Sequence, residues 1–411
     1  MNRPLPGNLL VLQGGGPTPV LNTSLFGIIH EARQHRAIRR MLGARYGVAG
    51  LLEDDLVDLS LLPQRELKQL KTTPGASLGS TRHKLTEADV EQIVTRLRER
   101  EIRYLLLVGG NGSMRAADLI AQGAAALGHE LSVIGVPKTI DNDIPLTDRC
   151  PGFGSAARYV AQSVRDLGLD IQSLPQPVSI YETMGRSSGW LAGASVLARG
   201  GLDEDQAPHL VYLSERPFEI ERFLGDLDRA VTRLGWAVVV VPEGLLDAAG
   251  QPVFENASPA QRDTLNRPLP GGVCVQLAEL VSQRLGIRCR WEKPGLCGRA
   301  SSLHVSPVDR EDAEQVGRAA VRGVLAGECG KMVSLRSLDA RDHELCDFVP
   351  LSEVAGGERR IPAAWQEDSA ESAVTTDFLR YLRPIVGGLV DYPVPLKDQL
   401  TAKRSFQRQH A

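Results

Sequence analysis

The chain has 411 residues, of which 42% are hydrophobic, and a formal net charge of -3 from 47 basic and 50 acidic side chains. This length and apolar content exclude a small binding module and predict two lobes with large buried cores. The near balance of charge gives no overall attraction to nucleic acid or to an anionic membrane, so any anion site must be local.

The six cysteines lie far apart, with no C-x-x-C pair and no His-Cys cluster at zinc spacing. This pattern argues against a disulfide framework and against a structural zinc site. The apolar run near the N-terminus is too short for a signal peptide, and no stretch approaches the length of a membrane span. We therefore expect a cytoplasmic protein without nucleic-acid or membrane partners.

Five apolar runs, each followed by a turn, predict β-strands that are buried on both faces of a parallel sheet. In chain order they are NLLVLQGGG, YLLLVGGNG, LSVIGVPKT, PVSIYETMG and AVVVVPEGL. Helical patterns lie between them: residues 86–101 carry one apolar stripe, and Thr86 with Asp89 is a capping signal. The alternation predicts a doubly wound α/β protein, whose ligands bind beyond the carboxyl ends of the strands.

The first of these turns is QGGGPTPVLNTS. Gly15 and Gly16 follow a strand, and Asn22, Thr23 and Ser24 open a helix, so backbone amides and a helix N-terminus could meet an anion there. A tight structural turn explains the same residues equally well. The segment matches neither the dinucleotide G-x-G-x-x-G pattern nor the G-x-x-x-x-G-K-[ST] phosphate loop, so both of these nucleotide-binding classes lose support.

The segment GVPKTIDNDIPLTDRCPGFGSAARY is the most informative part of the chain. Asp141 and Asp143 lie two residues apart at a predicted strand end, and Lys138 precedes the first by three residues. Spacing by two in an extended segment points both carboxylates the same way, which suits one as a base and the other near a metal. Lys138 would neutralise charge on a transferred phosphoryl group. On composition alone, a solvated turn is the alternative.

These residues carry a family resemblance. PKTIDND, with GGNGS upstream and ETMGR downstream, resembles the phosphofructokinase family, and GGGPTPVLN, PGASLGSTR and VVVPEG occur in the family's order. The resemblance implies two doubly wound, Rossmann-like lobes of mostly parallel sheet, with the active site in the cleft between them. It also implies that residues 1–150, joined by part of 298–365, form the donor-phosphate lobe. Residues 151–411 would form the sugar-phosphate lobe and a C-terminal extension.

The resemblance implies phosphoryl transfer to a sugar phosphate with Mg²⁺, and a role for each matching residue. The catalytic set is Asp141 as the base, with Lys138 and Arg82 acting on the transferred group. The donor-binding set is Gly15, Gly16, Gly110, Asn111, Gly112 and Ser113. The substrate-binding set is Thr139, Asp143, Met184, Gly185, Arg186, Glu243, Arg290 and Arg299. Asn111 and Asp143 are the metal candidates.

The donor end departs from the family pattern. Members that use ATP generally read GGDGS, and members that use pyrophosphate usually carry an acid at the second variable position, whereas this chain has Asn111 and Gly112. Asn111 brings no negative charge and is a poorer ligand for a hard cation. Lys138 is similar to the lysine of pyrophosphate users, but Gly112 is similar to the small residue that leaves room for ATP. The flanking sequence favours pyrophosphate.

The acceptor end departs as well. Pro177 stands where the family has an arginine that often reaches a neighbouring subunit's sugar phosphate, and Leu296 stands where a histidine or another polar residue is common. One phosphate contact is therefore missing unless Lys293 or Arg158 replaces it. A charge-assisted contact of this kind is worth roughly 1.5–3 kcal/mol, enough to alter the choice of acceptor.

From the resemblance we expect a homo-oligomer that moves a phosphoryl group from pyrophosphate to the 1-hydroxyl of fructose 6-phosphate, giving fructose 1,6-bisphosphate. One alternative is an ATP-dependent kinase of a different sugar or sugar phosphate. Another is a catalytically weak paralogue that binds a sugar phosphate and regulates a partner. Composition also changes near residues 202–206 and 355–360, which suggests insertions.

Overall fold

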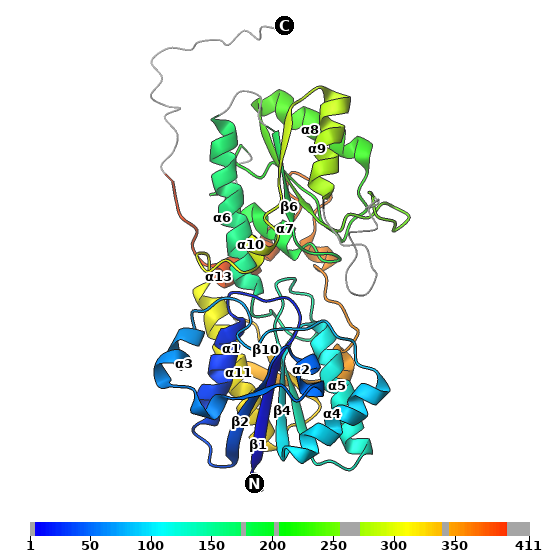
Figure 1. Ribbon diagram of the computed structural model, residues 1–411. Coiled ribbons are helices and arrows are strands. Elements are labelled where there is room, and N and C mark those ends of the chain that lie inside the picture. The colour runs from blue at the N-terminus through cyan, green and yellow to red at the C-terminus, as the bar shows by residue number, and fades with distance from the viewer. Residues whose placement is uncertain (1–4, 174–177, 201–204, 255–271, 339–344, 393–411) are drawn as a thin grey trace.

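The computed structural model describes residues 5–173, 178–200, 205–254, 272–338 and 345–392. These residues form two lobes, and each is built around its own β-sheet (Figure 1). The carboxyl ends of the parallel strands in both sheets face the junction between the lobes. The doubly wound fold with two Rossmann-like lobes and mostly parallel sheets is therefore confirmed.

The first lobe contains a seven-stranded sheet in the order β11-β10-β5-β4-β1-β2-β3. The two edge strands, β3 and β11, run antiparallel to their neighbours, and the strands between them are parallel. The strands are β1 Gly7–Gln13, β2 Ile38–Ala44, β3 Leu56–Asp58, β4 Ile102–Gly109, β5 Ser132–Pro137, β10 Lys331–Leu335 and β11 Cys346–Pro350.

Helices cover both faces of this sheet, which explains why its central strands are apolar without alternation. One face packs against α1 Leu21–Ala32, α3 Gln64–Leu70 and α11 Pro307–Ala326. The other face packs against α2 Val48–Leu52, α4 Glu87–Glu99, α5 Asn111–Ala126 and α12 Leu351–Val354. Helix α4 begins with the predicted capping box, in which the Thr86 and Asp89 side chains each accept a hydrogen bond from the other residue's backbone amide.

The second lobe contains a four-stranded parallel sheet in the order β7-β8-β6-β9. Its strands are β6 Val178–Thr183, β7 Leu210–Val211, β8 Ala237–Pro242 and β9 Cys289–Glu292. One face packs against α6 Phe153–Gln172, α7 Trp190–Ala194 and α13 Thr376–Val386. The other packs against α8 Ile220–Leu234 and α9 Val273–Leu285, and the short α10 Leu296–Arg299 contacts α6. Three 3-10 turns complete the described elements: Leu59–Leu61, Ser195–Ala198 and Ala363–Trp365.

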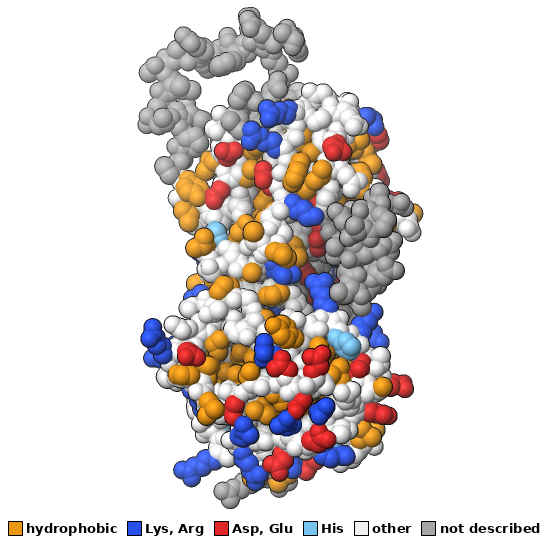
Figure 2. Space-filling model, viewed as in Figure 1, with side chains coloured by type: hydrophobic (Ala, Val, Ile, Leu, Met, Phe, Trp, Pro, Cys, Tyr) orange, Lys and Arg blue, Asp and Glu red, His pale blue; other side chains and the backbone are white. Residues whose placement is uncertain are grey.

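The chain passes between the lobes more than once (Figure 1). It enters the second lobe after β5, returns to the first lobe with α11, and leaves again after α12. On the face viewed in Figure 2, acidic and basic side chains are intermixed over the first lobe, as the near-neutral net charge leads one to expect. Among the described residues, no helix is long and apolar enough to cross a membrane.

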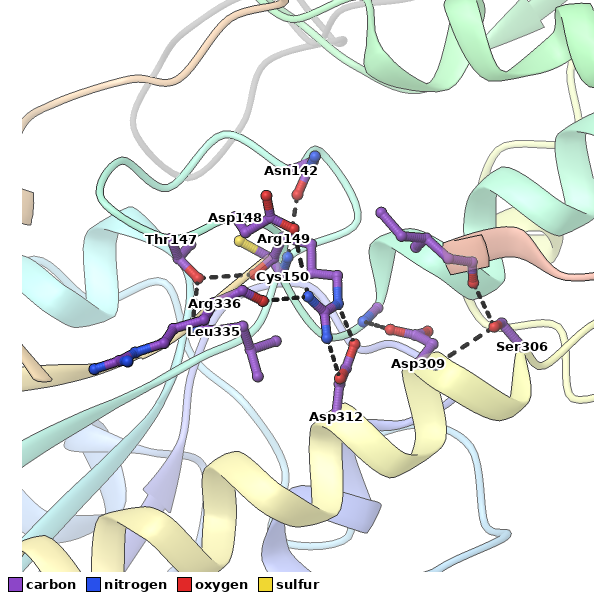
Figure 3. A network of polar contacts seen from close by, with 12 residues as sticks. Asn142, Thr147, Asp148, Arg149, Cys150, Ser306, Asp309, Asp312, Leu335 and Arg336 are labelled. Atoms are coloured by element: carbon purple, nitrogen blue, oxygen red, sulfur yellow. Dashed lines mark hydrogen bonds and ion pairs between the residues drawn. The ribbon is translucent and has the colours of Figure 1, made fainter. Parts of the chain in front are cut away.

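A buried polar network fastens the loop after β5 to helix α11 (Figure 3). Arg149 is 1% exposed, and its Nε and one terminal nitrogen each donate to a different carboxylate oxygen of Asp312 at 2.7 Å. One turn earlier in α11, Asp309 accepts from the backbone amides of Gly152 at 2.7 Å and Ser155 at 3.0 Å. Buried charged groups are costly when they lose their partners, so these hydrogen bonds strongly favour one position of the loop against α11.

Replacing Arg149 tests this attachment. Arg149→Met leaves Asp312 buried without its cation, so we expect the free energy of unfolding to fall by about 3–5 kcal/mol, as measured by urea denaturation. The matched control is Arg380→Ala, which removes an exposed ion pair with Asp377 and is expected to change stability by less than about 0.5 kcal/mol. Equal stability of the two variants would contradict this role of Arg149.

Candidate active site

A cavity of about 630 Å³ opens in the first lobe, where β1, β4 and β5 end. It brings together most of the residues that the sequence predicted for the donor side and for catalysis. Those that line it are Gly15, Gly16, Arg82, Gly110, Asn111, Gly112, Ser113, Lys138, Thr139, Asp141 and Asp143. Turns that are far apart in the sequence therefore form a single site.

The donor side of the cavity is built from cations packed against glycine backbone. Lys138 is 3% exposed, and its ammonium donates to the carbonyl oxygen of Gly16 at 2.8 Å. A Cβ atom at Gly15, where φ is 76°, would lie 3.1 Å from the same ammonium, and a Cβ at Gly16 would lie 3.1 Å from a guanidinium nitrogen of Arg299. Only glycine allows these side chains to approach the turn so closely.

The charges of this side act on one another. Burial, together with the positive charges of Arg299 and Arg82, lowers the pKa of Lys138 to about 8, although the negative charges of Asp141 and Asp143 oppose the shift. Burial and the charge of Arg82 also lower the pKa of Arg299. Cations that destabilise one another in this way provide a favourable site for a multiply charged anion, which would relieve their repulsion.

The two predicted carboxylates, Asp141 and Asp143, lie in the turn after β5. The Asp141 amide donates to the hydroxyl of Thr139 at 3.1 Å. Burial raises the pKa of Asp141, and the negative charges of Asp143 and Glu243 raise it further. The expectation of an extended segment is wrong, because Asn142 has a φ of 52° and turns the chain between the two aspartates. Both nevertheless line the cavity.

Asn111 and Asp143 form the candidate metal site. The Asn111 amide nitrogen donates to Asp143 Oδ2 at 2.9 Å. The remaining oxygens, Asn111 Oδ1 and Asp143 Oδ1, are buried and have no hydrogen-bond partner. Buried acceptors without a donor are costly, and oxygen atoms of this kind are the ligands that hard divalent cations prefer. The two residues therefore fit a divalent cation.

The composition of this pair also indicates which cation it suits. Among the described residues there is no cluster of three or more His, Cys, Asp or Glu side chains that could hold a metal. Mg²⁺ is usually bound through one or two carboxylates together with substrate phosphates and water, rather than by a complete protein cage. The site therefore fits Mg²⁺ better than it fits a metal that needs three or four protein ligands.

The acceptor side comes from the second lobe, where β6 and β8 end side by side. The Gly185 amide donates to Glu243 Oε1 at 3.3 Å. This bond joins the MGR turn, residues 184–186, to the PEG turn, residues 242–244. Ser188, in the same turn, donates its hydroxyl hydrogen to the carbonyl oxygen of Asp141 at 3.0 Å. Met184 is half-buried against the core, whereas Arg186 is exposed. These residues place the acceptor side directly beside Asp141.

Arg290 is not brought to this cavity within one chain. It is exposed on β9 and pairs with Ser179, four residues before the carboxyl end of β6 at Thr183. Four residues of strand span about 13 Å. Arg299, which the sequence grouped with Arg290, instead lies on the donor side beside Gly16.

The structure describes three of the four residues that the sequence connected with the missing phosphate contact. Leu296 is 65% exposed and adds no polar group to the site. The two suggested replacements already have partners, since the ammonium of Lys293 pairs with Glu182 at 3.4 Å and Arg158 donates to the carbonyl oxygen of Val386 at 3.3 Å. Pro177 lies outside the described residues.

The helix that follows the first glycine turn has a structural role. The Asn22 amide group donates to the carbonyl oxygen of Thr73 and accepts from the Ser77 amide, and the Thr23 hydroxyl donates to the carbonyl oxygen of Lys71. Gln13 accepts from the Leu78 amide. These contacts hold the loop that leads to Arg82. Gln13 lines the cavity, whereas Asn22 and Thr23 support it without lining it.

The segment after α12 contributes to the site, although no motif in the sequence predicts this. Gly356 lines the cavity, and the backbone amide of Arg359 donates to the carbonyl oxygen of Asp143 at 2.7 Å. The change of composition near residues 355–360 was the only signal in the sequence, and it suggested an insertion. No motif connects these residues with the aspartates, because more than 200 residues separate them.

Comparisons with known proteins agree with this geometry. The family model described as phosphofructokinase matches residues 8–324. A protein of Xanthomonas campestris pv. campestris named pyrophosphate--fructose 6-phosphate 1-phosphotransferase is 39% identical over 93% of this chain and 92% of its own length. A protein of Alkalicoccus urumqiensis named sulfofructose kinase is 36% identical over 96% of this chain and 98% of its own length.

A solved structure shares the whole architecture. The crystal structure of a pyrophosphate-dependent phosphofructokinase from Nitrosospira multiformis superposes with a TM-score of 0.84 at 31% identity, covering 96% of this chain and 95% of that chain. The match extends over both lobes, since it includes nearly all of each chain. On the family match, the extent of these similarities and the fold, this chain belongs to the phosphofructokinase family.

Proposed function

We propose that this chain is a phosphotransferase that moves a phosphoryl group from pyrophosphate to the 1-hydroxyl of fructose 6-phosphate. The observation that carries the proposal is the position of Asp141, which lines a cavity with Lys138 and Arg82 and accepts a hydrogen bond from Ser188 of the second lobe. A base at this position has phosphate-binding cations on one side and the MGR turn on the other. The pyrophosphate-dependent relatives support the choice of donor.

In the proposed reaction, Asp141 takes the proton from the acceptor hydroxyl while the hydroxyl oxygen attacks the nearer phosphorus of the donor. The new oxygen–phosphorus bond forms as the bond to the leaving phosphate breaks. Lys138, Arg82 and Arg299 neutralise the charge that spreads over the transferred group and the leaving phosphate. Positioning and electrostatics therefore supply most of the catalysis.

Asn111 and Asp143 would hold Mg²⁺, because each has a buried oxygen that lacks a donor. When bound, the ion supplies positive charge to the donor phosphates. Gly15, Gly16, Gly110 and Ser113 would contact the donor through the glycine turns that line the cavity.

On the acceptor side, Met184, Gly185 and Arg186 would hold the sugar phosphate, with Thr139 supporting the base and Glu243 accepting hydrogen bonds from sugar hydroxyls. The link between the Gly185 amide and Glu243 supports this grouping. Arg290 lies away from the cavity of its own chain, so it would contact only a substrate that is bound outside that cavity. The family resemblance implies a cytoplasmic homo-oligomer, and both features belong to the proposal.

Replacing the proposed base gives the first test. Asp141→Asn retains the shape of the side chain but cannot take a proton, so kcat should fall by a factor of about 10² to 10⁴. Turnover of fructose 6-phosphate with pyrophosphate and Mg²⁺ is the measurement, and urea denaturation checks the fold. The matched control is Asp377→Asn, an exposed aspartate on α13, which should retain wild-type turnover. Undiminished turnover in Asp141→Asn would remove Asp141 from the mechanism.

The pH dependence gives a second test. Because Asp141 acts as a base only when ionised, and its pKa is raised to about 7, kcat/KM should rise as the pH increases through about 7. Because Lys138 helps only when protonated, and its pKa is lowered to about 8, kcat/KM should fall as the pH increases above about 8. The free enzyme should therefore show a narrow bell-shaped profile.

Lys138→Met identifies the group behind the falling side of this profile. Methionine has no proton to lose, so the variant should have low activity that no longer declines above about pH 8. A rising side centred near the ordinary pKa of aspartate, about 3.9, would contradict the raised pKa of Asp141.

ATP as the donor is the second candidate function, and one observation favours it. A Cβ atom at Gly112 would meet nothing within 4 Å, and the cavity continues past this residue along Arg115, Ala116 and Leu119. Its volume of about 630 Å³ falls in the range of about 300–1,000 Å³ that holds drug-sized ligands, which are much larger than pyrophosphate. A nucleoside could occupy the additional space.

Crossing donors with variants of Gly112 separates the two candidates. Gly112→Asp places a carboxylate in the open space, which should lower kcat/KM for ATP at least about tenfold by like-charge repulsion while pyrophosphate use changes little. Gly112→Ala is the uncharged control. Wild-type turnover with pyrophosphate supports the first candidate, and turnover with ATP alone supports the second. Fructose 6-phosphate and sulfofructose, the acceptor suggested by the name of one relative, are compared in the same assay.

A further inference from the structure

The segment of residues 355–386 crosses from the first lobe to the second. It passes beside the catalytic loop, which comprises residues 138–152 between β5 and α6 and carries Asp141 and Asp143. It leaves the first lobe after α12, and Gly356 lines the donor cavity. The amide of Ile361 then donates to Glu215 Oε1 of the second lobe at 3.1 Å, and the segment ends with α13 at the junction of the lobes (Figure 1). The family model matches residues 8–324 and so does not include this segment.

Asn142 is the residue through which this segment reaches the catalytic loop. It lies between Asp141 and Asp143, is 0% exposed and has a φ of 52°. Its side-chain oxygen accepts from the Cys150 amide at 3.1 Å, and its side-chain nitrogen donates to the Tyr381 hydroxyl at 3.1 Å. Positive φ is uncommon outside glycine and is tolerated best by asparagine, so these two bonds hold a turn that few residues would adopt.

Tyr381 connects both ends of the loop. Its hydroxyl accepts from Asn142 and donates to the carbonyl oxygen of Asp148 at 2.7 Å. In Figure 3 a dashed line joins the Asn142 side chain to the backbone of Cys150, and Asp148 lies next to Arg149, which fastens this loop to α11. One hydroxyl therefore joins the catalytic turn to the anchored end of the same loop.

Arg359 adds a second attachment from the same segment. Its backbone amide donates to the carbonyl oxygen of Asp143 at 2.7 Å, and its guanidinium donates to the carbonyl oxygen of Asn142 at 3.5 Å. The guanidinium carbon lies 4.4 Å from the centroid of the Trp190 ring and 5.8 Å from that of Tyr381. Cation–π contacts of this kind are worth more where water is excluded, so the arginine is held firmly.

A cluster of aromatic rings from α7, α13 and the 3-10 turn Ala363–Trp365 holds the ring of Tyr381 in place. Its ring centroid lies 5.7 Å from that of Trp190 and 5.0 Å from that of Trp365, and Trp190 stacks on Phe378 at 5.8 Å. Packed aromatic rings add stabilisation beyond the area that they bury. Tyr381 therefore offers the loop a hydroxyl whose position is set by the rigid core of the second lobe.

We propose that Tyr381 and Arg359 are positioning residues that act through Asn142 and the loop backbone to hold Asp141 and Asp143 in the geometry required for phosphoryl transfer. The hydrogen bonds of these side chains go to Asn142 and to the carbonyl oxygen of Asp148, and neither residue is among the described residues that line the donor cavity. The inference rests on the proposed function, because it assigns these aspartates to catalysis. It makes the segment of residues 355–386 part of the catalytic apparatus as well as part of the fold.

The test uses Tyr381→Phe in the full-length protein. This change keeps the ring in the aromatic cluster and removes only the hydroxyl shared by Asn142 and Asp148. Misplacement of a reacting group lowers the rate without weakening ground-state binding, so we expect kcat to fall about tenfold while KM for both substrates changes less than about twofold. The matched control is Tyr392→Phe, which removes hydroxyl hydrogen bonds to Asp166 and Gln162 and should retain wild-type kcat.

A second variant examines the pathway through Asn142. Asn142→Gly permits the positive φ but removes the side chain that contacts Tyr381. If both residues act through one link, the double variant Asn142→Gly/Tyr381→Phe should show the fall in kcat of Asn142→Gly alone, not the product of the two single effects. Independent, multiplying effects would overturn a shared link.

Hydrogen exchange of the amides in residues 139–150 gives a readout that does not depend on turnover. Tyr381→Phe should exchange faster than wild type in this region, and Tyr392→Phe should not. Wild-type kcat in Tyr381→Phe overturns the positioning role, whether or not exchange is faster. If the wild-type protein fails to use pyrophosphate and fructose 6-phosphate, the proposed function fails. Hydrogen exchange alone then decides whether Tyr381 holds the loop.

Discussion

The buried ammonium of Lys138 is the interaction on which the site depends. It donates to the carbonyl oxygen of Gly16 and lies against the Gly15 turn, so it links the carboxyl end of β5 to the turn after β1 across the intervening β4. The positive charge of Lys138 partly offsets the rise that burial causes in the pKa of Asp141. The positive charge of Arg299, in turn, lowers the pKa of Lys138. A phosphate anion in this place would offset the repulsion between Lys138 and Arg299.

The second constraint is that the two carboxylates belong to a loop that spans both lobes. Helix α11 holds one end of this loop through Asp309 and Asp312, and the turn at Asn142 is held by residues that follow α12. The loop therefore has contacts on all sides, in contrast to a solvated turn. Rigid placement of this kind suits a reaction in which the protein contributes geometry and charge rather than a covalent intermediate.

The altered glycine turn fits the donor and metal site of the proposed function. Asn111 contributes an oxygen without charge, and Asp143 contributes the carboxylate, so the pair keeps the chemistry that a hard cation needs. The open space at Gly112 enlarges the cavity without disturbing these groups. In the proposed function, replacement of this one family residue would therefore change which donors fit more than how a phosphoryl group is transferred.

The sequence alone determined the strands, the glycine turns and the motif that holds Lys138 and Asp141, because continuous apolar runs and short spacings are local properties of the chain. Only the tertiary structure decided that Arg299 lies beside Gly16, that Arg290 lies apart from the cavity, and that Tyr381 contacts Asn142. The physical reason is that these contacts join segments more than 100 residues apart along the chain or depend on strand register. Their formation is set by packing of the two lobes and leaves no periodic pattern in the sequence.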